Sequence, residues 1–322
     1  MRALVRRAGR VSLEDLPEPG LAGVRDVLIQ VTMAGLCRTD LYVARGSLVV
    51  DEPRVLGHEM AGVVLEAGRR AGFRPGERVT VIPTLACGAC AGCAVEAECF
   101  EPRFLGVDAD GAFAERIVVP STHVIGVPAG LDAKRAAYAE PVAAALAVLQ
   151  APLPREGRGL VMGDNRIAGL IRRILSIHGF SDVAGAAGAE AAAARAPFDF
   201  VIETEATAAS LAAMVELLRP HGLGVLKSRP AAPVPIDIAK AVKKNLRFSA
   251  VAYGPFDRAI ALLAGGALDI DELLGEAFAL DDFERAFAAA EASDASKIFL
   301  SICPEPAPPT AGADALAQLA HA

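Results

Sequence analysis

The segment GLVMGDNRIAGLIRRILSIHG, residues 159–179, joins an apolar run to a helical pattern through a turn that contains glycine. Residues 159–163 have the apolar character of a buried strand, and residues 167–178 have the periodicity of a helix. The alternation continues on both sides of this segment. Helical patterns lie at 131–150 and 206–218, and apolar runs lie at 198–203 and 224–227. Strands that alternate with helices indicate a parallel sheet covered by helices, and therefore the α/β class.

The first 125 residues differ in texture from the segment that follows. They contain short runs of alternating hydrophobicity, such as DVLIQVT at 26–32 and AGVVLE at 61–66, separated by glycine and proline. Short alternating runs between turn residues predict a mostly β domain. Near the end of the chain, residues 270–302 predict a pair of helices followed by a strand. The last residues, 304–322, are rich in proline and alanine, and we expect them to be disordered.

Length and composition exclude several classes of protein. The chain has 322 residues, which predicts about two domains, and 53% of them are hydrophobic. The net charge is −7, and no run of like charge suggests a nucleic-acid-binding surface. We find no apolar stretch of membrane-spanning length and no apolar secretory leader. Four of the six cysteines cluster within residues 87–99, which favours metal binding in a reducing cytoplasm over a disulfide framework.

One set of potential metal ligands is distributed over three short motifs. They are Cys37-Arg-Thr-Asp40, Gly57-His-Glu59 and Glu140-Pro141. Cys37, His58 and Glu59 offer a thiolate, an imidazole and a carboxylate, the three ligand types that a catalytic zinc site combines with one open position. Glu140 would be a further ligand or would hold the metal-bound water, and Asp40 would orient a ligand. The alternative is that Cys37 and His58 are ordinary core residues.

A second set consists of cysteines alone. Cys87, Cys90, Cys93 and Cys99 have the spacing C-x2-C-x2-C-x5-C. Four thiolates on one short loop match a closed structural zinc site, and the intervening glycines allow the tight wrapping that this spacing requires.

Together these motifs resemble the zinc-containing medium-chain dehydrogenase/reductase family, which includes alcohol, polyol and threonine dehydrogenases. The resemblance extends to about residue 302, and the other matching segments lie at 35–40, 56–62, 76–79, 110–115, 139–143, 219–226 and 280–287. It implies a GroES-like, mostly β catalytic domain from residues 1–150 and 271–303. It implies a Rossmann-type nucleotide-binding domain with a parallel sheet at 151–270.

The resemblance also implies roles for individual residues. Cys37, His58 and Glu59 would hold the catalytic zinc, with Glu140 as in polyol and threonine dehydrogenases. Thr39 would relay the substrate proton, and Arg38 would contact the cofactor pyrophosphate. The four clustered cysteines would hold a structural zinc, although the family usually has seven residues in the last gap and this chain has five.

The turn that binds a dinucleotide in this family is altered here. On the pattern G-x-G-x-x-G, the chain has Gly163, Asn165 and Ala168, and these residues with Ile167 are the candidate cofactor-binding residues. We expect Asn165 to preserve the turn by adopting positive φ, while its side chain crowds a phosphate. The acid that usually binds the ribose is missing from 181–188, and no arginine follows closely to favour a 2′-phosphate.

The nucleotide-binding part is also short. Only 18 residues separate Gly179 from Phe198, fewer than a complete strand–helix–strand unit requires. We therefore expect one helix and one strand of the first half to be lost or reduced. Glu203 and Glu205 follow the strand at 198–202, where they would either contact the cofactor or form a solvated loop.

These observations predict a zinc-dependent oxidoreductase that transfers hydride between a secondary alcohol or polyol and NAD or NADP. The alternative is a zinc-binding member of the fold that has lost or altered dinucleotide binding and has another role. A zinc-independent reductase on this fold is disfavoured because both metal motifs are present. By resemblance, the protein would be a homodimer or homotetramer. It would act on a small molecule whose identity the sequence does not specify.

Overall fold

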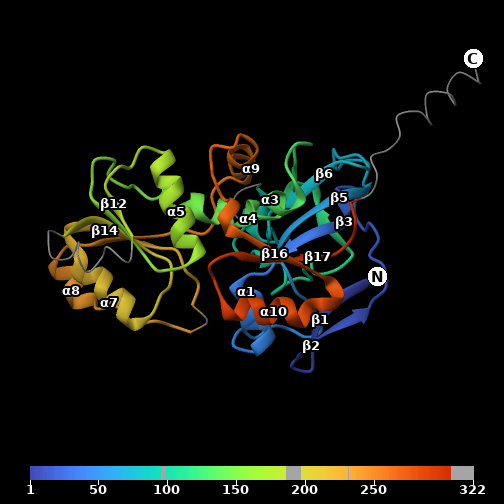
Figure 1. Cartoon of the computed structure of the whole chain (residues 1–322), viewed down its shortest axis with the longest axis horizontal. Coiled ribbons are helices and arrows are strands. Elements are labelled where there is room, and N and C mark those ends of the chain that lie inside the picture. Colours follow the sequence, from blue (N-terminus) through green and yellow to red (C-terminus); the bar gives the residue numbers. More distant parts are fainter. Residues whose placement is uncertain (96–98, 186–196, 231, 306–322) are drawn as a thin grey trace, which may run out of the picture.

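The computed structural model describes residues 1–95, 99–185, 197–230 and 232–305, and it contains two main sheets (Figure 1). The first sheet has seven strands. Six follow the order β10-β6-β5-β3-β17-β16, and β9 pairs with β3. Its strands are β3 (Asp26–Gly35), β5 (Glu59–Ala67), β6 (Arg78–Val81), β9 (Arg116–Pro120), β10 (Val124–Gly126), β16 (Leu274–Ala279) and β17 (Lys297–Ser301). The predicted strands at 26–32 and 61–66 are thus the paired strands β3 and β5 of this sheet.

Two small sheets flank the first sheet. One has the order β2-β1-β4, and the other is the pair β7-β8. Their strands are β1 (Arg2–Arg7), β2 (Arg10–Asp15), β4 (Arg54–Val55), β7 (Thr84–Leu85) and β8 (Arg103–Phe104). The pair β7-β8 encloses the segment that carries the four clustered cysteines.

The end of the chain returns to the first sheet. Strand β17 pairs antiparallel with β3, and β16 pairs parallel with β17. The expectation of two helices at 270–302 was wrong in its first half, because residues 274–279 form β16 and only 283–292 form a long helix. The sequence LGEAFA of β16 has little strand propensity, so pairing with β17 decides its conformation.

The second sheet is parallel and has the order β12-β11-β13-β14-β15. Its strands are β11 (Gly159–Met162), β12 (Val183–Ala184), β13 (Phe198–Glu203), β14 (Leu218–Leu226) and β15 (Arg247–Ala250). Within the described residues, β12 has only two residues and lies at the edge of the sheet. The expected loss or reduction of one helix and one strand in the first half stays a prediction, because residues 186–196, where its helix was expected, lie outside the described residues.

The helices are mostly short. They are α1 (Arg38–Arg45), α2 (Ala91–Ala94), α3 (Ala133–Ala137), α4 (Ala139–Leu146), α5 (Arg166–Ile177), α7 (Ala208–Leu217), α8 (Ile238–Lys243), α9 (Phe256–Ala264) and α10 (Phe283–Ala292). Four single 3-10 turns are η1 (Ser121–His123), η2 (Ala147–Gln150), η3 (Asp271–Leu273) and η4 (Leu280–Asp282). Among the described helices, none has the length and apolar character that a membrane crossing would require.

Helix α4 joins the two parts of the molecule. Every residue of α4 is buried, and the helix contacts α5, α9 and β5 (Figure 1). Its sequence AEPVAAAL is mostly alanine, whose small side chains let neighbouring elements approach closely. One apolar core therefore runs from Phe299 of β17 through Ala143 to Ile171 of α5 and Phe200 of β13. Arg38 at the start of α1 lies 3.7 Å from Glu205, which follows the carboxyl end of β13.

The predicted domain ranges, 1–150 with 271–303 and 151–270, are compatible with these two sheets and stay a prediction. The proline-rich tail was expected to be disordered, and residues 306–322 of it lie outside the described residues.

Candidate active site and metal centres

The loop between β3 and α1 presents Cys37 at the start of a helix. Cys37 has extended backbone angles, and the Asp40 Oδ2 accepts its N–H at 2.9 Å. The other carboxylate oxygen of Asp40 accepts the N–H of Gly57 at 3.1 Å. Asp40 is almost completely buried, so one carboxylate ties together the two loops that carry Cys37 and His58.

His58 and Glu59 follow a glycine that no other residue could replace without rearrangement. Gly57 has φ of +95°, and a Cβ there would lie 2.3 Å from the Phe113 ring. This tight turn directs His58 and Glu59 toward Cys37, and ligand atoms of the three residues lie within 4.8 Å of one another. The sequence prediction that these three side chains converge therefore agrees with the geometry.

Asp40 lies close to His58 as well as to the two loops. The Nδ1 of His58 is 3.5 Å from the Asp40 Oδ1, at the outer limit of a hydrogen bond. Burial acts to lower the pKa of His58, but the charges of Asp40 and Cys37 outweigh burial and raise that pKa well above its usual range. Asp40 thus has the position predicted for a residue that orients a ligand.

Lys297 is a partner of Glu59 that the sequence analysis missed. Its ammonium group donates to the Glu59 Oε1 at 2.6 Å and to the Leu36 carbonyl at 3.0 Å, and the lysine is 2% exposed. The other carboxylate oxygen, Oε2, is buried without a hydrogen-bond partner in the described residues. Gly35 makes room for it, because a Cβ there would lie 2.3 Å from this oxygen. A lysine at the start of an apolar strand carries no local signal of such a contact.

Glu140 lies at the start of α4 and lines the same cavity. Its carboxylate accepts a hydrogen bond from the Tyr253 hydroxyl, a second partner that the sequence analysis did not identify. Burial raises the pKa of Glu140, and the nearby charge of Glu59 raises it further. Glu140 is not one of the three residues whose ligand atoms lie within 4.8 Å, so its role as a metal ligand stays a prediction.

The second cysteine motif forms a compact group of sulfur atoms. The Sγ atoms of Cys87, Cys90, Cys93 and Cys99 lie within 4.8 Å of one another. The N–H of Phe100 donates to the Cys90 sulfur at 3.4 Å, and this bond with a second main-chain N–H, that of Cys93, lowers the pKa of Cys90 to about 6. A lowered pKa favours the thiolate that a metal binds. The short gap before Cys99 therefore does not keep this residue away from the group.

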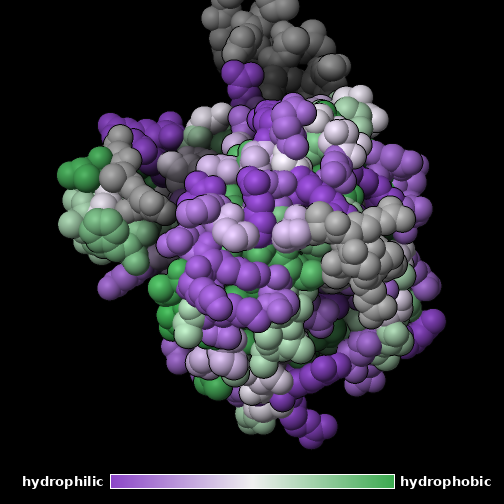
Figure 2. All heavy atoms as spheres, turned by 90° about the vertical axis from the view of Figure 1, so that its left-hand side faces the viewer, coloured by the Kyte–Doolittle hydropathy of each residue, from purple (hydrophilic) through white to green (hydrophobic). Residues whose placement is uncertain are grey.

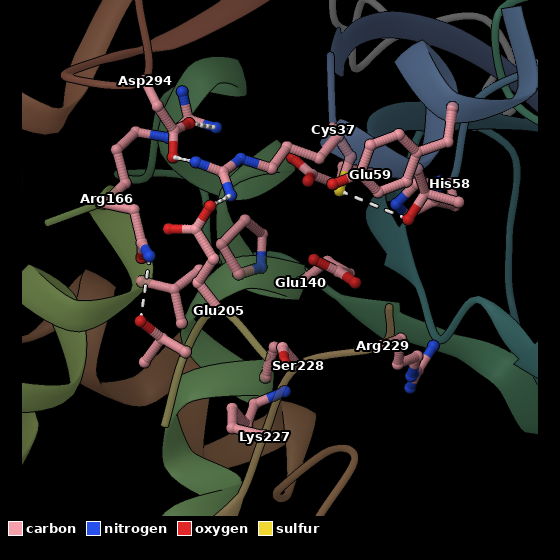
Figure 3. Close-up of a pocket in the computed structure, with 18 of the residues that line it drawn as sticks. Cys37, His58, Glu59, Glu140, Arg166, Glu205, Lys227, Ser228, Arg229 and Asp294 are labelled. Carbon is pink, nitrogen blue, oxygen red and sulfur yellow. Dashed lines mark hydrogen bonds and ion pairs between the residues drawn. The ribbon is translucent and has the colours of Figure 1, made fainter. Parts of the chain in front are cut away.

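A cavity of about 400 Å³ opens above the first group of ligands. Figure 3 shows Cys37, His58 and Glu59 together with Glu140 around this space. The residues that line it come from both parts of the molecule, and on the second sheet's side they lie in α5 and in the loops that follow the strands. They include Thr39, Tyr42, Ser47, Phe104, Tyr138, Asn165, Ile167, Thr204, Lys227, Ser228, Arg229 and Tyr253. The Thr39 hydroxyl is 3.8 Å from the Cys37 sulfur. A small molecule in the cavity would therefore contact the potential metal ligands and the second sheet at once.

Comparison with known proteins agrees with this geometry. Residues 23–129 match the alcohol dehydrogenase GroES-like domain. A "Putative D-xylulose reductase" from Rhizobium meliloti (strain 1021) is 30% identical over 326 residues, which cover 89% of this chain and 94% of that protein. The chain belongs to the zinc-containing medium-chain dehydrogenase/reductase family.

Two further matches support membership of this family. An L-threonine 3-dehydrogenase from Anaeromyxobacter sp. (strain K) is 28% identical over 345 residues, 93% of this chain and 98% of that protein. The crystal structure of a "putative zinc-binding dehydrogenase" from Sinorhizobium meliloti 1021 bound to NADP has a TM-score of 0.82 and 26% identity, covering 93% of this chain and 98% of that chain. The predicted family and α/β fold class are confirmed, and the chain is an oxidoreductase of the alcohol dehydrogenase type.

In this dehydrogenase, the turn between β11 and α5 differs from the conformation expected. Gly163 adopts φ of +116°, and a Cβ there would lie 2.2 Å from the Thr204 hydroxyl. The expectation of positive φ at Asn165 was wrong, because φ of Asn165 is −138°. Asn165 instead caps α5: its Oδ1 accepts the N–H of Ala168 at 3.0 Å, and its Nδ2 donates to Thr204 at 2.9 Å. Capping a helix requires extended backbone angles, and this requirement overrides the left-handed tendency of asparagine.

Arg38, the candidate pyrophosphate contact of this dehydrogenase, lies within a charged cluster. Figure 3 shows three other members of this cluster, Arg166, Glu205 and Asp294, on one side of the cavity. The Arg38 guanidinium pairs with Asp294 at 2.9 Å and lies 3.7 Å from Glu205. Asp294 also pairs with Arg166, the first residue of α5, at 2.9 Å. Glu205 thus faces the cleft, whereas Glu203 is buried and accepts the N–H groups of Lys227 and Ser228. The two glutamates that the sequence analysis considered together have different environments.

An arginine also lies at the end of β12, where the dehydrogenase family usually binds the adenosine ribose. A Cβ at Gly185 would lie 1.8 Å from Arg172 Nη1, so the Arg172 side chain packs directly over this glycine. The sequence analysis found that no arginine follows this strand closely. Arg172 precedes the strand and reaches it from α5.

Proposed function

We propose that this protein oxidises a secondary alcohol or polyol, or reduces the corresponding carbonyl compound, with NAD or NADP at a zinc-dependent site. The observation that supports this best is the convergence of Cys37, His58 and Glu59 at the floor of a cavity formed by both sheets. Glu140 lies beside them, where burial and the charge of Glu59 raise its pKa. A catalytic zinc site requires a small number of mixed ligands at the base of a substrate cavity.

The donor set fits a catalytic zinc. Cys37 supplies a thiol, His58 an imidazole and Glu59 a carboxylate whose second oxygen is buried without a hydrogen-bond partner in the described part of the chain. A cation there would satisfy that oxygen. When bound, zinc would polarise the substrate oxygen and favour loss of its proton.

The residues around this group have distinct tasks in the proposal. Asp40 holds the loops of Cys37 and His58 together and orients the imidazole. Thr39 lines the cavity beside Cys37, and its hydroxyl passes the substrate proton toward solvent. Glu140, held by Tyr253, supports the ligand group as an additional carboxylate or by accepting a hydrogen bond from bound water. A bound nicotinamide cofactor would supply the acceptor for the hydride of the alcohol carbon.

A second, structural zinc would be held by Cys87, Cys90, Cys93 and Cys99. Four thiolates with mutual separations below 4.8 Å are the donor set of closed zinc sites. This site lies on the segment between β7 and β8, where it would stabilise a loop that has little secondary structure of its own.

The dinucleotide would bind along the start of α5. Gly163 allows close approach of the turn, and the first N–H groups of a helix, here Arg166 and Ile167, are suited to bind phosphate oxygens. Asn165 and Ala168 flank this site, and Arg38 faces it across the cavity. Arg172 at the end of β12 favours a cofactor with a 2′-phosphate, so we propose NADP as the preferred cofactor.

We also propose that two copies of the chain pair through the second sheet. Strand β15 is an edge strand, and several large hydrophobic side chains near it are exposed: Ile238 and Val242 of α8 and Phe248 of β15. Figure 2, which looks onto this end of the molecule, shows hydrophobic surface among hydrophilic side chains. An exposed edge strand with hydrophobic neighbours favours pairing with a second chain. The free thiols of both ligand groups favour a reducing compartment, and we propose the cytoplasm.

The alternative, a zinc-binding member without ordinary dinucleotide binding, has one specific observation in its favour. The side chain of Asn165 occupies the turn that phosphates approach, and Glu205 and Asp294 surround Arg38 with negative charge.

Calorimetric titration of NADH and NADPH into zinc-loaded protein decides between the two. The chain has no tryptophan, so fluorescence energy transfer to the cofactor is not an option. Micromolar binding, tighter for NADPH, followed by turnover of secondary alcohols would support the dehydrogenase. Absence of binding to either dinucleotide in folded, zinc-loaded protein would refute it and favour the alternative.

A further inference from the structure

Two cationic side chains of the cavity have no counter-ion. Five lysine and arginine residues line the cavity, and three of them, Arg38, Arg166 and Lys297, form ion pairs with carboxylates. Lys227 and Arg229, both on the loop that follows β14, form no ion pair with any residue that the structure describes. One wall of the reaction cavity therefore carries two cations that no described carboxylate binds directly.

Arg229 is held in place by aromatic rings rather than by acids. Its guanidinium lies 5.3 Å from the centre of the Phe104 ring and 5.1 Å from that of Tyr253. Contacts of this kind orient an arginine while leaving its N–H groups available to a ligand. Figure 3 shows Arg229 on the same side of the cavity as His58.

The Phe104 ring also connects Arg229 to the potential metal ligands. Phe104 packs against the His58 imidazole, with ring centres 4.9 Å apart. Tyr253, the other ring, donates its hydroxyl hydrogen to Glu140. A substrate whose oxygen lies at the Cys37–His58–Glu59 group would thus have Arg229 one aromatic ring away.

Lys227 adds a second positive charge on the same loop as Arg229. Its ammonium group donates to the Ala252 carbonyl at 3.1 Å, which is a neutral acceptor. Burial lowers the pKa of Lys227 to about 8, although the charges of Glu140 and Glu203 act to raise it from beyond ion-pair distance. The neighbouring Ser228 is not available to a ligand in the same way, because it bonds to Glu203.

We infer that Arg229, supported by Lys227, binds an anionic group of the substrate, so that the alcohols oxidised here are those that carry a carboxylate or a phosphate. This inference rests on the proposed function, since it assigns a substrate class to that same cavity. Arginine binds both carboxylate and phosphate oxygens through paired N–H donors, so the two classes share one recognition chemistry.

The test compares related ligands with and without an anionic group. The first pair is 3-hydroxybutyrate and butane-1,3-diol, and the second is glycerol 3-phosphate and glycerol. Binding to zinc-loaded protein is measured by calorimetry, and turnover with NADP is measured in parallel. We compare the wild type with Arg229→Gln, Arg229→Lys and a control, Arg285→Gln. Arg285 also stacks on an aromatic ring, 5.4 Å from the centre of Phe278, but it lies outside the cavity.

We expect the wild type to bind at least one anionic ligand more tightly than its neutral partner. Arg229→Gln should weaken that binding about 10- to 100-fold, the range of one hydrogen bond to a charged group. Arg229→Lys should restore part of it, and Arg285→Gln should change nothing. The pair that responds distinguishes a carboxylate substrate from a phosphate substrate.

Three results would overturn the inference. They are equal binding of anionic and neutral ligands by the wild type, equal weakening of both by Arg229→Gln, and a matching loss of NADPH affinity, which would assign Arg229 to the cofactor. The proposed function fails separately. If Arg229-dependent binding of an anion occurs without any turnover, the anion site stands and the dehydrogenase activity does not. If alcohols are oxidised without regard to charge, the activity stands and the anion site does not.

Discussion

Replacing Lys297 by methionine removes the only cation that pairs with Glu59 in the described residues. Methionine has nearly the length of lysine, so the apolar part of the side chain keeps its packing. The carboxylate is left 1% exposed, and water cannot replace the lost ammonium group. The change therefore isolates the cost of an uncompensated charge beneath the cavity.

The magnitude follows from the burial of the pair. Side-chain exposures of 3% for Lys297 and 1% for Glu59 leave little screening by solvent. Breaking a buried ion pair by removing one partner costs about 3–5 kcal/mol. We expect the free energy of unfolding to fall by about 3 kcal/mol.

The assay is urea unfolding of the zinc-free protein followed by circular dichroism, because a bound cation would compensate the charge. The double variant Glu59→Gln/Lys297→Met should recover more than half of the loss. The exposed control Lys243→Met should change the unfolding free energy by no more than about 0.5 kcal/mol. A loss below about 1 kcal/mol for Lys297→Met, or no recovery in the double variant, would refute the argument that this pair is a buried charge pair.

Three other changes test separate parts of the site. Cys99→Ser should lower the zinc content by about one ion per chain in mass spectrometry, whereas Cys303→Ser should not; unchanged zinc would exclude Cys99 as a ligand. Glu205→Gln should tighten NADPH binding about two- to fivefold in calorimetry, because Glu205 competes with phosphate for Arg38, and weaker binding would contradict this. Glu140→Gln should stabilise the zinc-free protein against urea by about 1 kcal/mol at pH 8 and less at pH 5. Burial raises the pKa of Glu140 in the folded protein, so ionisation of this carboxyl lowers the stability as the pH rises from about 4.5 toward the raised pKa. An effect of Glu140→Gln that does not change with pH would contradict this.

The parts of the site that could be predicted from sequence are those encoded by short spacing. Cys37, His58 and Glu59 have side chains that seldom occur together without a shared task, and the turn at Gly57 brings them together. The cysteine group is local as well, since all four residues belong to one loop. The parallel sheet could also be predicted, because the alternation of strands and helices after residue 150 is encoded in short local patterns.

The parts that could not be predicted depend on contacts between distant segments. Lys297 reaches Glu59 across 238 positions, and Tyr253 reaches Glu140 across 113. Arg172 reaches the end of β12 from the preceding helix, so a search of the residues that follow the strand overlooks it. Asn165 shows a different limit: its residue type suits both a left-handed turn and a helix cap, and only the backbone decides between them.

The return of the chain end to the first sheet has a consequence for biosynthesis. Strand β17 pairs with β3, which lies more than 260 positions earlier, and the same strand supplies Lys297 beneath Glu59. While the ribosome is still adding the second sheet, residues 33–35 of β3 lack the partner that β17 provides, and Glu59 lacks Lys297. Contacts so far apart in sequence form slowly, and an open edge strand invites pairing with other chains. The reaction cavity can therefore be completed only after β17 has emerged, so the active site cannot form until both sheets have been synthesised.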